Sequence, residues 1–152
     1  MSDARPDKAH AVGINHVALE VGDISEALEF YGRFLAFTVE EQTDDMAIVY
    51  FGDQFINFIR NPDRRPDTMR HFGIAVDDKP LVRRTLEAMG IPLLDSRFLD
   101  FLDPWGNRVE ITTYTNIQFT KAEHVLRGMG LGHLAKSDEA IAELRAKGMA
   151  PR

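Results

Sequence analysis

INHVALEV, residues Ile14 to Val21, alternates between apolar and polar side chains as a half-buried β-strand does. Asp23 then lies three residues before Glu26, a spacing that suits the first free amides of a helix. The apolar residues expected on one stripe of this helix and its end are Ile24, Ala27, Leu28, Tyr31, Phe34 and Leu35. Short strands are expected next at 37–41, 46–51 and 55–60. The predicted order is strand, helix, three strands.

The same order occurs a second time along the chain. HFGIAV, which starts at His71, mirrors HVALEV, which starts at His16. A helix follows, with Pro80 suited to its first turn and Gly90 placed to end it. Further strands are expected at 91–94, 97–102 and 108–114. Between the copies, NPDRRPD at 61–67 is charged and broken by proline, which predicts a surface linker. The repeat indicates two modules with one geometry.

Composition excludes several classes of protein. A chain of 152 residues with 44% hydrophobic content can bury a core. The net charge is −6 and no Lys/Arg block has interleaved aromatics, so no nucleic-acid surface is indicated. Cysteine is absent, which excludes disulfides and thiolate metal sites. No segment approaches membrane-spanning length and the first ten residues have no apolar core, so we expect a cytoplasmic protein without a membrane partner.

The two repeated strands each have a bulky face and a face of small residues. Because side chains alternate across a strand, His16 shares a face with Ala18, and His71 shares one with Gly73 and Ala75. The opposite faces are bulky and can pack under the helices. The histidine faces therefore leave room for a ligand.

The last strand carries an acidic residue on such a face. Glu110 lies there with Arg108 and Thr112, and a buried carboxylate without a partner is costly. If the two modules curl their sheets toward each other, His16, His71 and Glu110 can converge. Two imidazoles and one carboxylate bind Fe(II), Mn(II), Zn(II), Ni(II) or Co(II) and leave open positions for substrate. The alternative is that all three are hydrogen-bonded polar residues of the core.

INHVALEVGDISEALEFY and RHFGIAVDDKPLVRRTLEAMGI, closed by FLDPWGNRVEI, resemble the vicinal oxygen chelate superfamily, which includes glyoxalases, extradiol dioxygenases and bleomycin-binding proteins. The resemblance implies an α+β fold of two tandem βαβββ modules that form a cupped mixed sheet with helices on the outside. Such proteins are commonly homodimers. We expect this domain at 12–115, with modules at about 12–61 and 69–115, between a polar tail at 1–11 and a helical extension at 116–152.

The resemblance also implies where metal ligands lie, on the first and last strands of each module: His16, Asn57, His71 and Glu110. Asn57 departs from the pattern, because an amide oxygen is a poor ligand for the softer divalent metals and cannot act as a base. This disfavours glyoxalase I chemistry. The remaining set looks like the two-histidine, one-glutamate pattern of extradiol dioxygenases and fosfomycin-modifying transferases.

These implications give an expected function. A small oxygenated substrate would chelate Fe(II), Mn(II), Zn(II) or Ni(II) through two oxygens, for dioxygenase-like or lyase/isomerase chemistry. We expect catalytic roles for Glu110 and Tyr114, and substrate contacts from Asn57, Arg108 and Thr112. The alternative is a metal-free protein that sequesters a drug or aromatic metabolite.

The extension is expected to hold two short helices, the first capped by Thr120 and the second by Ser137. It could serve as a lid over the site, as a dimer arm or as a cover for a sheet edge.

Overall fold

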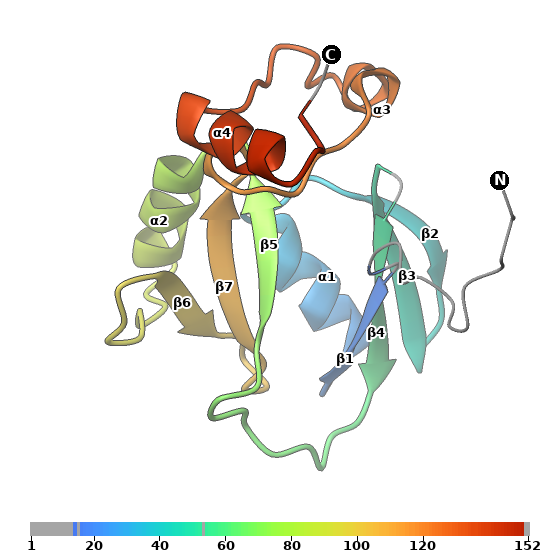
Figure 1. Cartoon of the computed structure of the whole chain (residues 1–152). Coiled ribbons are helices and arrows are strands. Elements are labelled where there is room, and N and C mark those ends of the chain that lie inside the picture. The colour runs from blue at the N-terminus through green and yellow to red at the C-terminus, as the bar shows by residue number, and fades with distance from the viewer. Residues whose placement is uncertain (1–13, 15, 53, 151–152) are drawn as a thin grey trace, which may run out of the picture.

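The computed structural model describes residues 14, 16–52 and 54–150, and the predicted polar tail at 1–11 lies outside them. Two modules follow each other along the chain (Figure 1). The first consists of β1 (His16–Val21), α1 (Ile24–Gly32), β2 (Thr38–Gln42), β3 (Met46–Phe51) and β4 (Gln54–Arg60). The second consists of β5 (Phe72–Val76), α2 (Lys79–Ala88), β6 (Leu99–Leu102) and β7 (Arg108–Thr113). The extension consists of the 3-10 turn η1 (Tyr114–Asn116), α3 (Glu123–Gly128) and α4 (Asp138–Ala146).

Each module forms its own mixed sheet. The strand order is β1-β4-β3-β2 in the first and β5-β7-β6 in the second. The first and last strands of each module are parallel neighbours, with Ala18 opposite Asn57 and Gly73 opposite Glu110. His16 and His71 each precede the first member of these pairs by two residues, so they occupy equivalent positions. The predicted α+β fold with a repeated module is confirmed.

The second sheet has one strand fewer than predicted. Residues 91–94 form only an isolated bridge to Phe101. Pro92 has no amide hydrogen to donate to a ladder, and the Ser96 amide donates to the Leu94 carbonyl (2.9 Å), which turns the chain. The strand predicted next begins two residues later than expected.

Helix α1 joins the two modules into one core. Asp23 caps it by accepting a hydrogen bond from the Glu26 amide (2.9 Å), as the spacing predicted. The buried face of the helix consists of Ile24, Ala27, Phe30 and Tyr31. Phe30, which the predicted stripe omits, packs against Phe101 of β6 with ring centroids 6.3 Å apart. Tyr31 stacks on a β4 ring 5.0 Å away. The helix lies between the sheets in Figure 1 and carries aromatic contacts to both.

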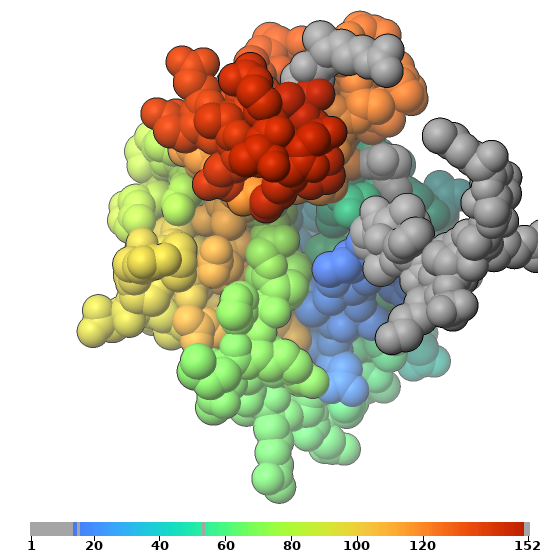
Figure 2. All heavy atoms as spheres, in the orientation of Figure 1, coloured from blue at the N-terminus to red at the C-terminus, as the bar shows by residue number. Residues whose placement is uncertain are grey.

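The C-terminal extension packs over one end of the second sheet (Figures 1 and 2). The Lys136 ammonium donates to the carbonyls of Tyr114 (2.5 Å) and Ile117 (2.9 Å), and also to that of Phe119. These bonds fix the path of η1 and of the residues after it. The buried side chains of η1, α3 and α4 are Tyr114, Leu126, Ala140 and Leu144. None of the helices in the described part of the chain is long and apolar enough to cross a membrane.

The two helices of the extension begin differently. Ser137 caps α4, because its hydroxyl accepts a hydrogen bond from the Ala140 amide (3.2 Å), as predicted. The residue preceding α3 is Ala122, which offers no side-chain cap, so the predicted capping role of Thr120 is wrong. The chain enters α3 two residues later than the capping pattern indicates.

Candidate functional site

The exposed face of the second sheet presents the predicted histidine and glutamate side by side. Val109 and Ile111 are fully buried on the core side of β7, so Glu110 between them faces outward, with its side chain 17% exposed. His71 stands directly before β5, next to β7, and its side chain is 45% exposed. The Nε2 atom of His71 lies 3.8 Å from Oε2 of Glu110.

One ring nitrogen of His71 is hydrogen-bonded to the backbone. Its Nδ1 atom lies 2.9 Å from the carbonyl oxygen of Met69. A carbonyl can only accept, so Nδ1 carries a hydrogen and the neutral ring presents a lone pair at Nε2. Nε2 faces the Glu110 carboxylate, with which a protonated ring forms an ion pair. When the ring is neutral, the pair therefore places two acceptors opposite each other.

His16 lies elsewhere in the single chain. Its ring stacks on Phe55 of β4, with centroids 4.6 Å apart and planes at 9°. Figure 1 shows β4 pointing down and β5 pointing up. Since β1 is parallel to β4, the start of β1 and the start of β5 lie at opposite ends of the two sheets, which separates His16 from His71. Within residues 14, 16–52 and 54–150, no three His, Asp or Glu side chains are grouped closely enough to hold one metal ion. The predicted convergence of His16 with His71 and Glu110 therefore does not occur within one chain.

Arg108 is held by the protein itself. Its Nε and Nη2 atoms donate to Oδ2 of Asp100 (3.1 and 2.5 Å), and its Nη1 donates to the Thr68 carbonyl (2.9 Å). Asp100 is 1% exposed, and its second oxygen, Oδ1, is buried with no hydrogen-bond partner among the described residues. Sequence reasoning missed Asp100, although a charged residue inside the apolar run LDFL was a signal that it needs a partner.

Of the other predicted site residues, Thr112 lies two residues after Glu110 on the same face of β7, whereas Asn57 and Tyr114 lie elsewhere. Thr112 donates to the Ile74 carbonyl (3.4 Å). Asn57 lies on the first sheet, on the same face as His16, and its Oδ1 is buried without a hydrogen-bond partner in the part of the chain that the structure describes. The Tyr114 hydroxyl accepts a hydrogen bond from the Lys121 amide (3.1 Å) at the base of the extension. The structure thus gives Tyr114 a place in the joint between sheet and extension.

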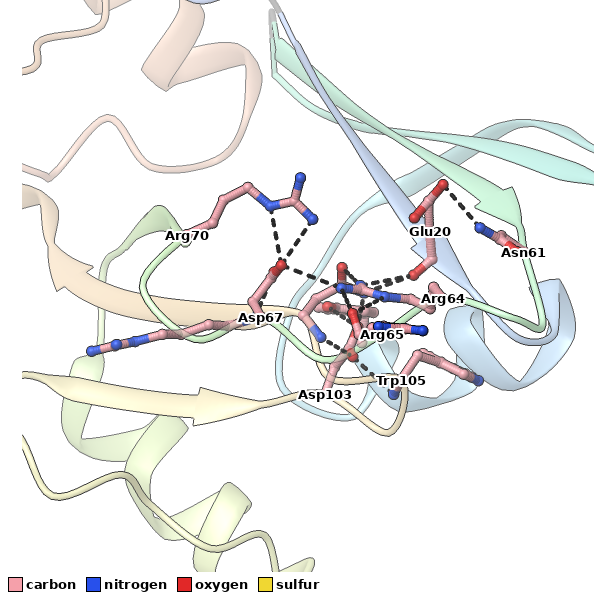
Figure 3. Close-up of polar contacts among 11 residues, drawn as sticks. Glu20, Asn61, Arg64, Arg65, Asp67, Arg70, Asp103 and Trp105 are labelled. Carbon is pink, nitrogen blue, oxygen red and sulfur yellow. Dashed lines mark hydrogen bonds and ion pairs between the residues drawn. The ribbon is translucent and has the colours of Figure 1, made fainter.

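The linker between the modules is an anchor, which corrects its predicted role as a simple surface loop. The Arg64 side chain is only 3% exposed. It donates to the Glu20 carbonyl at the end of β1 (3.2 Å) and to Oδ1 of Asn107 in the turn before β7. Figure 3 shows this cluster, in which the linker arginine reaches both modules. Charge and proline content predicted exposure, but could not reveal that one arginine points inward.

A buried aspartate organises the turn between β6 and β7. Asp103, 4% exposed, accepts hydrogen bonds from the Tyr31 hydroxyl (2.7 Å), the Asn107 side chain (2.7 Å), and the Trp105 and Asn107 amides (2.9 and 2.8 Å). Burial raises the pKa of Tyr31 well above its ordinary value, and the Asp103 charge and hydrogen bond add to this effect. Gly106 closes the turn with φ 83°, against Pro66 of the linker.

The linker makes stability depend on pH through Asp67. Burial alone would raise the pKa of Asp67, but the hydrogen bonds and charges of Arg70, Arg64 and the Arg108 amide lower it below its ordinary value. A carboxyl group with a lower pKa in the folded state stabilises the fold above its ordinary pKa of about 4 and loses that contribution as pH falls through the folded value. We expect Asp67→Asn to unfold at lower urea concentration than wild type near neutral pH, and the difference to shrink below about pH 4. A constant difference across that range would contradict the assignment.

Comparison with known proteins agrees with this architecture. The family model described as Glyoxalase/Bleomycin resistance protein/Dioxygenase superfamily matches residues 13–111, about two thirds of the chain. No curated protein matches. Among solved structures, the chain is similar to lactoylglutathione lyase from Agrobacterium tumefaciens (21% identity, TM-score 0.55, covering 68% of this chain and 95% of that one). It is also similar to a bleomycin resistance determinant encoded on the transposon Tn5 (18%, 0.53, 67% and 98%). At these identities the likeness shows the fold.

Proposed function

Because the chain belongs to the glyoxalase/bleomycin resistance protein/dioxygenase superfamily, we propose that it is a metal-dependent enzyme acting on a small oxygenated molecule. The proposal rests on one observation above all. His71 Nε2 and Glu110 Oε2 present lone pairs to each other across 3.8 Å, with the other ring nitrogen already committed to the Met69 carbonyl. Two ligand atoms that are each about 2.1 Å from one ion can lie up to about 4 Å apart. A divalent cation fits the chemistry of this pair.

A homodimer supplies the third ligand in this proposal. The starts of β1 and β5 lie at opposite ends of the two sheets, and both His16, at the start of β1, and His71, just before β5, are exposed. A twofold axis that places the first sheet of one copy against the second sheet of its partner would bring His16 of the former to the His71/Glu110 pair of the latter. The symmetry repeats this contact, so it would occur twice per dimer. The dimer would thus hold two equivalent sites, each built from both chains.

The donor set indicates the class of metal and of chemistry. Two imidazoles and one carboxylate suit Fe(II), Mn(II), Zn(II) or Ni(II). The bound ion would act as a Lewis acid on two oxygens of a chelating substrate. Glu110 supplies the charge that holds the cation. Asn57 lies on the same face as His16, and its amide oxygen is buried without a hydrogen-bond partner among the described residues, so a substrate hydroxyl would reach it only after the side chain turns outward. This arrangement fits dioxygenase-like chemistry better than a reaction needing a second carboxylate base.

Metal content and thermal stability test the proposal. Protein stripped with a chelator is titrated with Fe(II), Mn(II), Zn(II) and Ni(II), and unfolding is followed by calorimetry. A metal that binds the folded state but not the unfolded state stabilises the protein by about 2.7 kcal/mol when its free concentration is one hundred times its Kd. This raises Tm by several degrees. A purified protein without bound metal, and with a Tm that none of the four ions raises, would contradict the proposal.

A second candidate is supported by an aromatic row on the first sheet. His16 stacks on Phe55, and Phe55 lies 5.2 Å from the Tyr50 ring, so three rings cross three neighbouring strands on one face. Such a row can hold a planar apolar molecule without a metal. In that case the chelator-treated protein would be stabilised by aromatic compounds and not by metal ions, so a parallel titration with aromatic compounds distinguishes the two functions.

A further inference from the structure

The segment that leads into β5 is fixed by few contacts. The Met69 side chain is 78% exposed and that of Arg70 is 80% exposed, so packing does not hold the backbone there. Asp67 and Thr68 are tied to the second module instead. The Asp67 amide donates to the Gly106 carbonyl (2.7 Å), and the Thr68 carbonyl accepts from Arg108 Nη1 (2.9 Å). The Thr68 carbonyl is adjacent in the chain to the Met69 carbonyl.

His71 depends on that neighbouring carbonyl for its orientation. Its side chain is nearly half exposed, so the bond from Nδ1 to the Met69 oxygen is the main constraint on the ring that the structure shows. If Thr68 is released, the Met69 carbonyl is free to turn away from the ring. The proton could then move to Nε2, which would present a donor where the site needs a lone pair.

Arg108, which bonds the Thr68 carbonyl, is itself oriented by Asp100. Oδ2 of Asp100 accepts both Nε and Nη2 of Arg108, and this aspartate is almost completely buried. Asp100 lies opposite Glu110 in the antiparallel β6–β7 pair, and Arg108 lies two residues from Glu110 on β7. Strand β7 therefore carries both Glu110 and Arg108, and Arg108 anchors the backbone at Thr68, just before His71.

We propose that Asp100 and Arg108 are positioning residues that fix the tautomer and direction of the His71 ring. Asp100 orients the guanidinium, the guanidinium holds the Thr68 carbonyl, and the adjacent Met69 carbonyl keeps the hydrogen on Nδ1. Residues that orient a metal ligand without touching the metal typically contribute about 10–100-fold to metal affinity. The effect on metal affinity rests on the proposed function, whereas the effect on the tautomer does not.

The tautomer is read directly from the ¹⁵N chemical shifts of the His71 ring in metal-free protein near pH 8.5, where an ordinary imidazole, with a pKa of about 6.5, is neutral. Wild type should show hydrogen on Nδ1. Arg108→Met, which keeps the length of the stem but donates no hydrogen bond, should shift the population toward hydrogen on Nε2 and weaken Zn²⁺ or Mn²⁺ binding at least about tenfold. Arg70→Met is the matched control, because Arg70 bonds Asp67 but not Thr68, and it should leave the tautomer unchanged.

The outcomes separate this proposal from the proposed function. An unchanged His71 tautomer in folded Arg108→Met would overturn the positioning role. If Arg108→Met does not fold, Arg108→Lys is used in its place. The lysine ammonium can pair with Asp100, but it lacks the separate guanidinium nitrogen that bonds the Thr68 carbonyl. Wild-type protein that binds neither metal, but shows the Nδ1 tautomer and loses it in the Arg108 variant, would contradict the metal site and support the positioning role.

Discussion

Asp103→Ala should lower the free energy of unfolding by about 2–4 kcal/mol, the largest stability effect that we expect from a single polar substitution in this chain, because several buried donors lose their acceptor at once. The substitution removes the acceptor of four hydrogen bonds in a buried site. It would leave the Tyr31 hydroxyl without its acceptor and would leave the Asn107 side-chain amide with only its bond to the Glu20 carbonyl. Those two groups come from α1 and from the turn before β7, so the loss should loosen the joint between the modules. Urea unfolding followed by circular dichroism and by tryptophan fluorescence measures the change.

Two further variants identify the source of this effect. Tyr31→Phe removes one donor and should cost about 1–2 kcal/mol, because the Asp103 carboxylate keeps its other three bonds. Asp63→Ala, in the exposed part of the linker, should change stability by less than about 0.5 kcal/mol. A value for Asp103→Ala as small as that for Asp63→Ala would show that the buried cluster does not hold the modules together.

Loss of metal is the second large effect. We expect His71→Ala, Glu110→Ala and His16→Ala each to weaken metal binding by more than about 100-fold. Residues that only orient a metal ligand already contribute about 10–100-fold to metal affinity, and loss of a ligand itself should cost more. His124→Ala is the control, since that histidine is exposed on α3 in the extension. Elemental analysis of the four purified variants measures retained metal. Full occupancy in the His71 or Glu110 variant would remove this pair from the site.

The sequence predicted the repeat and its faces well because both depend on local periodicity. Alternation placed Val109 and Ile111 in the core and Glu110 outside it, and the structure confirms this. The cap at Asp23 was equally readable, because an N-cap depends on residues three positions apart. His16 and His71 occupy equivalent positions, as the repeat indicates.

The features that sequence reasoning missed depend on contacts between distant parts of the chain. Nothing local to Arg64 distinguishes it from its exposed neighbour Arg65, yet its side chain reaches an asparagine 43 positions away. The opposite directions of β4 and β5 likewise depend on how the two modules pack together, which neither module shows by itself. For this reason periodicity could show which face His16 occupies, but not that one chain keeps it apart from His71.

Mixing two metal-deficient variants tests the central claim that each site combines His16 of one copy with His71 and Glu110 of another. In a randomised mixture of His16→Ala and Glu110→Ala, about half of the dimers contain one chain of each kind, and each of these has one intact site. Bound metal should therefore recover to about one quarter of the wild-type content. His71→Ala mixed with Glu110→Ala should recover none, because every site then lacks one ligand. Recovery in neither mixture, with dimers present in both, would contradict a site shared between two copies.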